Sequence, residues 1–158
     1  MKITIKKVIL IFISLAVLLT IYVFKMEIQV YMGRMIEIYV PIFNEYDVKK
    51  ETHGGFHGDG ETFITMQFSD KQAEKFIKKV KENEHWRELP FTGFFDNFVD
   101  IEHGYWFAID RYFHNNDTYN SIKYNIDGIA GDDRAALNYT LAVFDTDNNM
   151  LYFYEMDT

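Results

Sequence analysis

A charge-free apolar run near the N-terminus, from Val8 to Phe24, constrains this chain more than any other feature. About 20 helical residues at a rise of 1.5 Å cross the core of a bilayer. The apolar stretch of a secretory signal is usually shorter, about 7 to 15 residues, and small residues at a cleavage site follow it. Here the bulky sequence TIYVFKM ends the run. The run therefore predicts an uncleaved signal anchor, a transmembrane helix over residues 1–25, rather than a cleaved signal peptide or a buried helix of a soluble protein.

Basic residues on the two sides of this run predict its orientation. Lys2, Lys6 and Lys7 precede it, and only Lys25 follows it closely. Positively charged flanks stay in the cytoplasm. We therefore expect a single-pass protein of the cell membrane with a cytoplasmic N-terminus and an extracytoplasmic C-terminal domain.

The segment after the anchor, residues 26–44, keeps a helical pattern with its polar residues on one side of the helix. Pro41 disfavours helix at the residue before it, so the pattern predicts that the helix ends there. The apolar side either lies in the membrane interface or packs beneath the globular domain. We expect a juxtamembrane amphipathic helix, or stalk, with a packed face.

Composition limits the partners of the remaining domain, residues 45–158. The chain of 158 residues has no cysteine, which excludes disulfides, thiolate metal sites and cysteine nucleophiles. Its net charge is -8, and four of its lysines belong to the anchor, so the domain is more acidic than the whole chain. Such an acidic domain repels nucleic acid.

The sequence of this domain predicts an α+β fold with the element order ββαβββ. Strands are predicted from β-branched and aromatic residues at 45–56, 61–68, 104–112, 138–146 and 150–158. Ser69 and Gln72 form a capping-box pattern at the start of one amphipathic helix. Short links between the strand pairs predict a mainly antiparallel sheet with this helix packed on one face. Trp86, after the helix, is expected to close the core rather than to hold a ligand.

The stretch THGGFHGDGE, from Thr52 to Glu61, joins the first two strands and allows three interpretations. Gly58 to Gly60 suit a tight hairpin turn whose residues need positive φ, which places His53 and His57 on the same face as Thr62. A metal site would use histidines and carboxylates, but two histidines four residues apart on a strand stand about 13 Å from each other. The glycines could also hold a phosphate on their backbone amides, although no P-loop lysine accompanies them. We expect the turn. The metal candidates are His53, His57, Asp59, His103 and His114.

Two other segments carry candidate ligand groups. The long polar connection from Phe113 to Ala136 is a binding candidate because loops of this length are commonly functional. Its candidate residues are Tyr119, Tyr124, Asp132, Asp133 and Arg134. The sequence DTDNNM, which starts at Asp145, imitates a calcium loop but has methionine at positions six and twelve, where glycine and glutamate are needed. It is better explained as a β-turn.

The soluble part resembles an uncharacterised group of small single-pass membrane-anchored proteins of Gram-positive bacteria. The resemblance rests on THGGFHGDGETF, on ENEHW followed by LP, on GYWF and on FDTDNNMLYFYEMDT, and it covers most of the chain after Glu45. It implies a location at the cell membrane and no particular activity.

Motifs of common enzymes are missing: the chain has no G-x-S-x-G elbow, no P-loop, no dinucleotide fingerprint and no H-E-x-x-H pair. We therefore expect a non-enzymatic binding or interaction module without a cofactor, with a protein partner in the envelope or a small ligand. One alternative is an inhibitor or immunity-type protein that blocks a basic or membrane-active toxin at the cell surface, which its acidic second half would suit through electrostatic steering. The other is a metal-dependent hydrolase that uses His53 and His57.

Overall fold

The computed structural model describes residues 5–42, 44–53, 59–90, 101–111, 122–124 and 138–157. A long helix, α1 (Ile5–Met35), leads into a domain built on one twisted sheet. The domain contains β1 (Tyr46–Glu51), β2 (Gly60–Gln67), α2 (Asp70–Glu82), β3 (Arg87–Glu88), β4 (Gly104–Arg111), β5 (Ile122–Tyr124), β6 (Asn138–Asp145) and β7 (Met150–Asp157).

The sheet has the strand order β1-β2-β7-β6-β4-β3, with β5 also paired to β4, and each described pairing is antiparallel. The predicted α+β class is therefore confirmed. The predicted order ββαβββ lacks β3 and β5, which are two and three residues long. Strands this short are too brief to show an alternating pattern in the sequence.

Helix α1 is long and apolar enough to cross a membrane by length and composition, and the side chains from Ile5 to Val23 are exposed. The helix ends at Met35, well before Pro41, where the sequence predicted its end. Glu37 adopts a left-handed conformation with φ 60°, and the Ile38 N–H donates to the Gly33 carbonyl over 3.1 Å. This is the bond of a Schellman motif, in which a residue with positive φ ends the helix and satisfies a terminal carbonyl.

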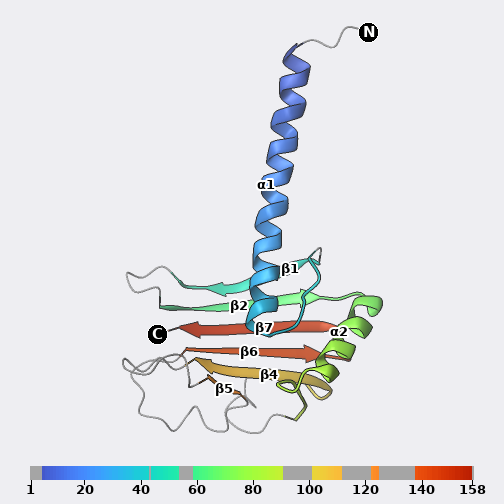
Figure 1. Ribbon diagram of the computed structural model, residues 1–158, viewed down its shortest axis with the longest axis vertical. Helices are drawn as coiled ribbons and strands as arrows, with labels where there is room; N and C mark the ends of the chain where they lie inside the picture. Colours follow the sequence, from blue (N-terminus) through green and yellow to red (C-terminus); the bar gives the residue numbers. More distant parts are fainter. Residues whose placement is uncertain are drawn as a thin grey trace.

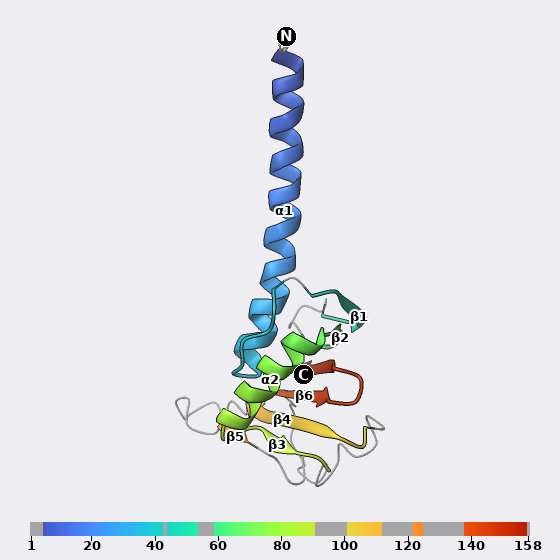
Figure 2. The same ribbon diagram turned by 90° about the vertical axis from the view of Figure 1, so that its right-hand side faces the viewer.

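The two helices cover the same face of the sheet, which we call the helix face (Figure 2). Beneath α2, Phe76 packs edge-on against Phe68 and tilts against Phe144, and the larger hydrophobic core forms around these rings. Trp86 is 6% exposed and packs against Phe76, so its predicted role in the core is confirmed.

The last turns of α1 and the segment that follows belong to this same core. Met32 and Ile36 are fully buried, and Ile38 and Val40 are buried beside them. The Trp86 Nε1–H donates to the Ile36 carbonyl over 3.0 Å. Residues that the sequence assigned to a juxtamembrane stalk thus share one core with the sheet, as the packed-face interpretation predicted.

The strands run across the axis of α1 (Figure 1). The β1 edge of the sheet lies on the side from which α1 arrives (Figure 1), and β3 and β5, which both pair with β4, lie farthest from it (Figure 2). Because α1 continues unbroken into the core, it fixes this edge-on arrangement of the sheet.

Candidate functional site

The face of the sheet opposite the helices, here called the open face, carries a second apolar cluster. Strand alternation turns every other residue of β2, β6 and β7 to this side. Phe63 pairs with Tyr154, Tyr154 with Leu141, and Tyr152 with Val143, so these side chains form one continuous row across three strands. The Tyr139 and Tyr154 rings lie 5.7 Å apart, and the Phe63 and Tyr154 rings 6.3 Å apart.

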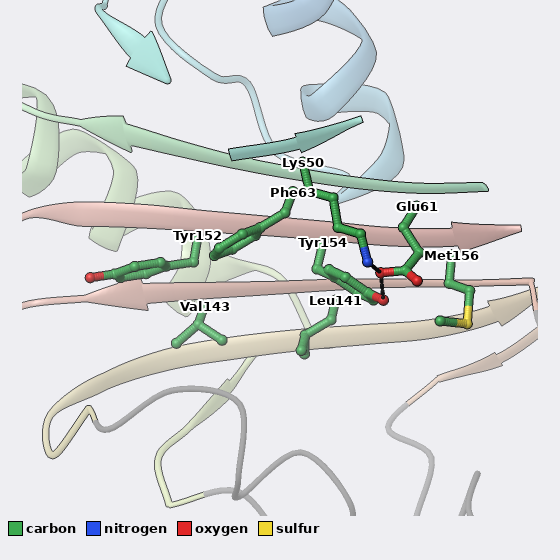
Figure 3. Close-up of a pocket in the computed structure, with 8 residues that line it drawn as sticks. All are labelled: Lys50, Glu61, Phe63, Leu141, Val143, Tyr152, Tyr154 and Met156. Carbon is green, nitrogen blue, oxygen red and sulfur yellow. Dashed lines mark hydrogen bonds and ion pairs between the residues drawn. The ribbon is translucent and has the colours of Figure 1, made fainter. Parts of the chain in front are cut away.

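A cavity of about 510 Å³ lies on the open face. Its lining is mainly aromatic and aliphatic (Figure 3). Lys50, Glu61 and the Tyr154 hydroxyl lie together at one end, here called the polar end, whereas the Tyr152 hydroxyl points away from them. The lining residues are Lys50, Glu61, Phe63, Leu141, Val143, Tyr152, Tyr154 and Met156. Predominantly apolar pockets with a few convergent polar groups are typical ligand sites.

The polar end of this cavity is a three-residue cluster from three strands. The Lys50 Nζ donates to Glu61 Oε2 over 2.6 Å, and the Tyr154 hydroxyl donates to the same oxygen over 2.9 Å (Figure 3). A register shift in β1 between Val48 and Lys50 brings Lys50 opposite Phe63. Without this bulge, Lys49 would occupy that position, because side chains alternate along a strand.

These contacts fix the protonation states of the cluster. The hydrogen bond from Lys50 lowers the pKa of the Glu61 carboxyl, and the bond from Tyr154 adds to the effect. Burial raises the pKa of the Tyr154 hydroxyl well above its usual range, and its bond to Glu61 raises it further. Burial also raises the pKa of Tyr139. At neutral pH Glu61 is therefore a carboxylate and Tyr154 a protonated phenol.

The histidine-glycine stretch is described only in part, since His57 lies outside the described residues. His53 lies on the helix face, as predicted: its Nδ1 is 2.7 Å from Glu51 Oε1 and 3.1 Å from Thr62 Oγ1. Asp59 is exposed. Gly60 begins β2, and its φ lies outside the left-handed range that we predicted for this turn. Its small size is needed for another reason, because a Cβ there would lie 2.6 Å from the His53 backbone nitrogen.

His103 does not join His53. The His103 Nδ1 lies 2.9 Å from Asp147 Oδ2. This histidine stands at the end of the sheet where Gly104 pairs with Asp145. Gly60, beside His53, pairs with Asp157 at the opposite end of β7. Eight residues of strand separate these ends by roughly 23 Å, so the two histidines cannot bind one ion. Within the described ranges, no group of three histidine or acidic side chains is placed to hold a metal ion.

The remaining sequence candidates are placed as follows. Tyr124 lies by its backbone in β5, whereas His114, Tyr119, Asp132, Asp133 and Arg134 lie outside the described residues. The predicted turn at Asp145 is confirmed. Asp145 Oδ1 accepts hydrogen bonds from the backbone amides of Asp147 and Asn148, which closes the link between β6 and β7.

Sequence reasoning missed the open-face cluster, although part of its signal was present. Phe63 and Tyr154 both occupy alternating positions in predicted strands. What the sequence did not show was that β2 pairs with β7, which brings Glu61 to Tyr154 across more than half of the chain. Comparison with family models, with curated proteins and with solved structures finds no match to this chain.

Proposed function

We propose that this protein is a membrane-anchored, extracytoplasmic binding module that holds a small, largely apolar ligand in the cavity of the open face. The apolar exposed part of α1 supports the anchor, and the lysines before it support a cytoplasmic N-terminus. The observation that carries the proposal is the cavity of about 510 Å³ with an aromatic wall and a hydrogen-bonded cluster at its polar end.

The chemistry of the polar end selects a neutral ligand. Lys50 and Glu61 already compensate each other, so a charged ligand would have to compete with one partner of this pair. Lys50 and Tyr154 both donate to Glu61 Oε2, which leaves Oε1 as an acceptor among the described contacts. A ligand with an apolar ring or chain and one hydroxyl or amide donor satisfies both parts of the cavity.

A binding role fits the titration behaviour better than catalysis does. A general acid or base works best with a pKa near the operating pH. In this cavity the pKa of Glu61 is lowered and that of Tyr154 is raised, so both move away from neutrality. The cluster is suited to hold a hydrogen-bonding group in a fixed orientation.

The binding test uses 1-naphthol, an apolar ring with one hydroxyl, titrated calorimetrically into the full chain in lipid nanodiscs. Empty nanodiscs correct for partition into lipid. We expect saturable binding that Leu141→Trp abolishes by filling the cavity. Tyr154→Phe should weaken it about five- to tenfold, because it removes a hydroxyl of the polar end worth about 1 kcal/mol.

Lys49→Gln is the matched control, since Lys49 lies on β1 but outside the cavity lining. It should bind 1-naphthol like the wild type. The proposed site would be wrong if 1-naphthol released no more heat with the wild type than with empty nanodiscs. It would also be wrong if Leu141→Trp bound 1-naphthol as well as the wild type does.

One observation favours the cell-surface inhibitor as a second candidate function. A separate cavity of about 440 Å³ on the helix face, beside Tyr31 of α1, carries the carboxylates of Glu51, Glu155 and Asp157. These charges suit a basic partner through electrostatic steering. Co-purification of one basic protein with the wild type, and not with Asp157→Lys, would favour this alternative.

A further inference from the structure

A network of buried and half-buried amide side chains connects α1 to the sheet and to α2. Gln29 Nε2 donates to the Asn44 carbonyl over 2.9 Å, and Asn44 Nδ2 donates to the Gln67 carbonyl over 3.0 Å. Gln72 Nε2 donates to Asn44 Oδ1 over 2.6 Å. One acceptor of this network is unpaired. Gln29 is 0% exposed, and its Oε1 has no hydrogen-bond partner among the described residues. A buried acceptor without a donor costs about 1–3 kcal/mol, so a ligand that brings a donor to this oxygen would remove that cost.

A small cavity lies beside this open acceptor. It has a volume of about 200 Å³ and is lined by Gln29, Val30, Gly33, Arg34, Tyr39 and Val40. The segment after α1 folds back closely along the helix, because a Cβ on Gly33 would stand 3.0 Å from the Ile38 carbonyl oxygen. Tyr39 is 68% exposed at the rim. The cavity therefore combines one buried acceptor, one guanidinium and an exposed aromatic ring.

The position of this cavity follows from the proposed membrane anchor, on which the inference rests. Gln29 lies about 8 Å along the helix from Phe24, where the apolar run ends. The polar layer of a bilayer is about 5–8 Å thick on each side of its core. Long helical side chains lean toward the N-terminus, so Arg34 leans toward the membrane. Gln29 thus lies at the outer edge of the headgroup layer, and Arg34, about 15 Å along the helix from Phe24, reaches back toward that layer.

We propose that this cavity binds a phospholipid headgroup whose terminal group is a hydrogen-bond donor. The guanidinium of Arg34 suits the phosphodiester, since its planar donors match phosphate oxygens. Gln29 Oε1 accepts from the terminal hydroxyl of a glycerol headgroup or the ammonium of an ethanolamine headgroup. A choline headgroup has no such donor. The exposed Glu27, two turns closer to the membrane than Arg34, disfavours headgroups with a second negative charge.

The test reconstitutes the full chain in nanodiscs of equal parts phosphatidylcholine, phosphatidylethanolamine and phosphatidylglycerol with identical acyl chains. Native mass spectrometry then counts the lipids that stay bound after release. We expect the wild type to retain the ethanolamine and glycerol lipids about tenfold over the choline lipid, which corresponds to about 1.4 kcal/mol. Gln29→Leu should remove this preference, and Arg34→Gln should lower the retention of all three lipids.

Lys49→Gln is the control, because it removes one positive charge from the exposed β1 strand outside this cavity. It should retain lipids like the wild type. Arg34 is exposed, so its variant keeps the test decisive even if Gln29→Leu does not fold. Equal retention of choline and donor-bearing lipids by the wild type would overturn the inference, and so would equal retention by Arg34→Gln and Lys49→Gln.

A second experiment distinguishes binding of a membrane lipid from binding of a soluble phosphodiester. Glycerophosphoethanolamine is titrated into the full chain in nanodiscs of phosphatidylcholine alone, and no saturable binding at micromolar concentration is expected. Tight binding of this soluble headgroup would overturn the assignment to a lipid. A chain that does not enter nanodiscs would remove the anchor and this inference together, whereas an inserted chain that is indifferent to headgroup would contradict the inference alone.

Discussion

A chain truncated to residues 45–158 is expected to remain unfolded, whereas a chain that starts at Glu27 is expected to fold without the apolar run. The shorter chain loses Met32, Ile36, Ile38 and Val40, which are buried in the larger core. Burial of each such side chain stabilises a protein by about 1.5–3 kcal/mol, or about 6–12 kcal/mol for the four. That loss is as large as the whole stability of a typical domain, about 5–15 kcal/mol.

Circular dichroism and proton NMR of the two purified chains check this expectation. The chain from Glu27 should show dispersed amide signals and a cooperative melt, and the chain from residue 45 should show neither. In the longer chain, Tyr39→Ala serves as a control in the same segment, because Tyr39 is largely exposed and should change stability little. A cooperative melt of residues 45–158 at the same temperature as the longer chain would show that the segment after the apolar run is not part of the core.

Replacement of Trp86 by alanine is expected to destabilise the domain by about 3–5 kcal/mol, the usual cost of truncating a buried aromatic side chain. The indole packs with its ring 5.7 Å from Phe76 and 5.7 Å from Phe107, so it joins α2 to the sheet. Its Nε1–H also donates to the Ile36 carbonyl at the end of α1. The substitution therefore opens a cavity and leaves a helix-terminal carbonyl without this donor.

Trp86→Phe separates the two contributions, because it keeps an aromatic ring and removes the donor. We expect its loss to be smaller than that of Trp86→Ala, with about 1 kcal/mol from the hydrogen bond and the remainder from the smaller ring. Thermal melts of the full chain in detergent, followed by circular dichroism, give both values relative to the wild type. An unchanged midpoint for Trp86→Ala would mean that the indole does not support the join between α1 and the domain.

Strong local signals explain what could be predicted of the fold. The capping box at the start of α2 is present, with the Ser69 N–H donating to Gln72 Oε1 over 3.0 Å. Strands β2, β4, β6 and β7 have enough β-branched and aromatic residues to be found from composition. The turn at Asp145 follows from the preference of aspartate and asparagine for such links.

Long-range contacts explain what could not be predicted. The apolar side chains after Phe24 have the same pattern whether they meet lipid or a sheet, so the sequence predicted a packed face without showing that Met32 and Ile36 are fully buried in the core of the domain. The bulge in β1 decides that Lys50, and not Lys49, reaches the open face. Gly60 looked like a turn residue, but its role depends on the close approach of His53, which only the folded hairpin reveals.

We propose that one helix anchors the chain in the membrane and enters the core of a domain outside the cell. Because the chain has no cysteine, a single introduced cysteine reports its own location without background. Cells that produce full-length Lys71→Cys or Lys6→Cys are treated with a membrane-impermeant maleimide before and after lysis. Lys71 is exposed on α2, and Lys6 lies near the start of α1.

Both variants are expected to sediment with the membrane fraction at full length. Lys71→Cys should be labelled in intact cells, and Lys6→Cys only after lysis. Labelling of Lys71→Cys only after lysis, or recovery of a soluble chain that has lost residues 1–25, would show that this topology is wrong.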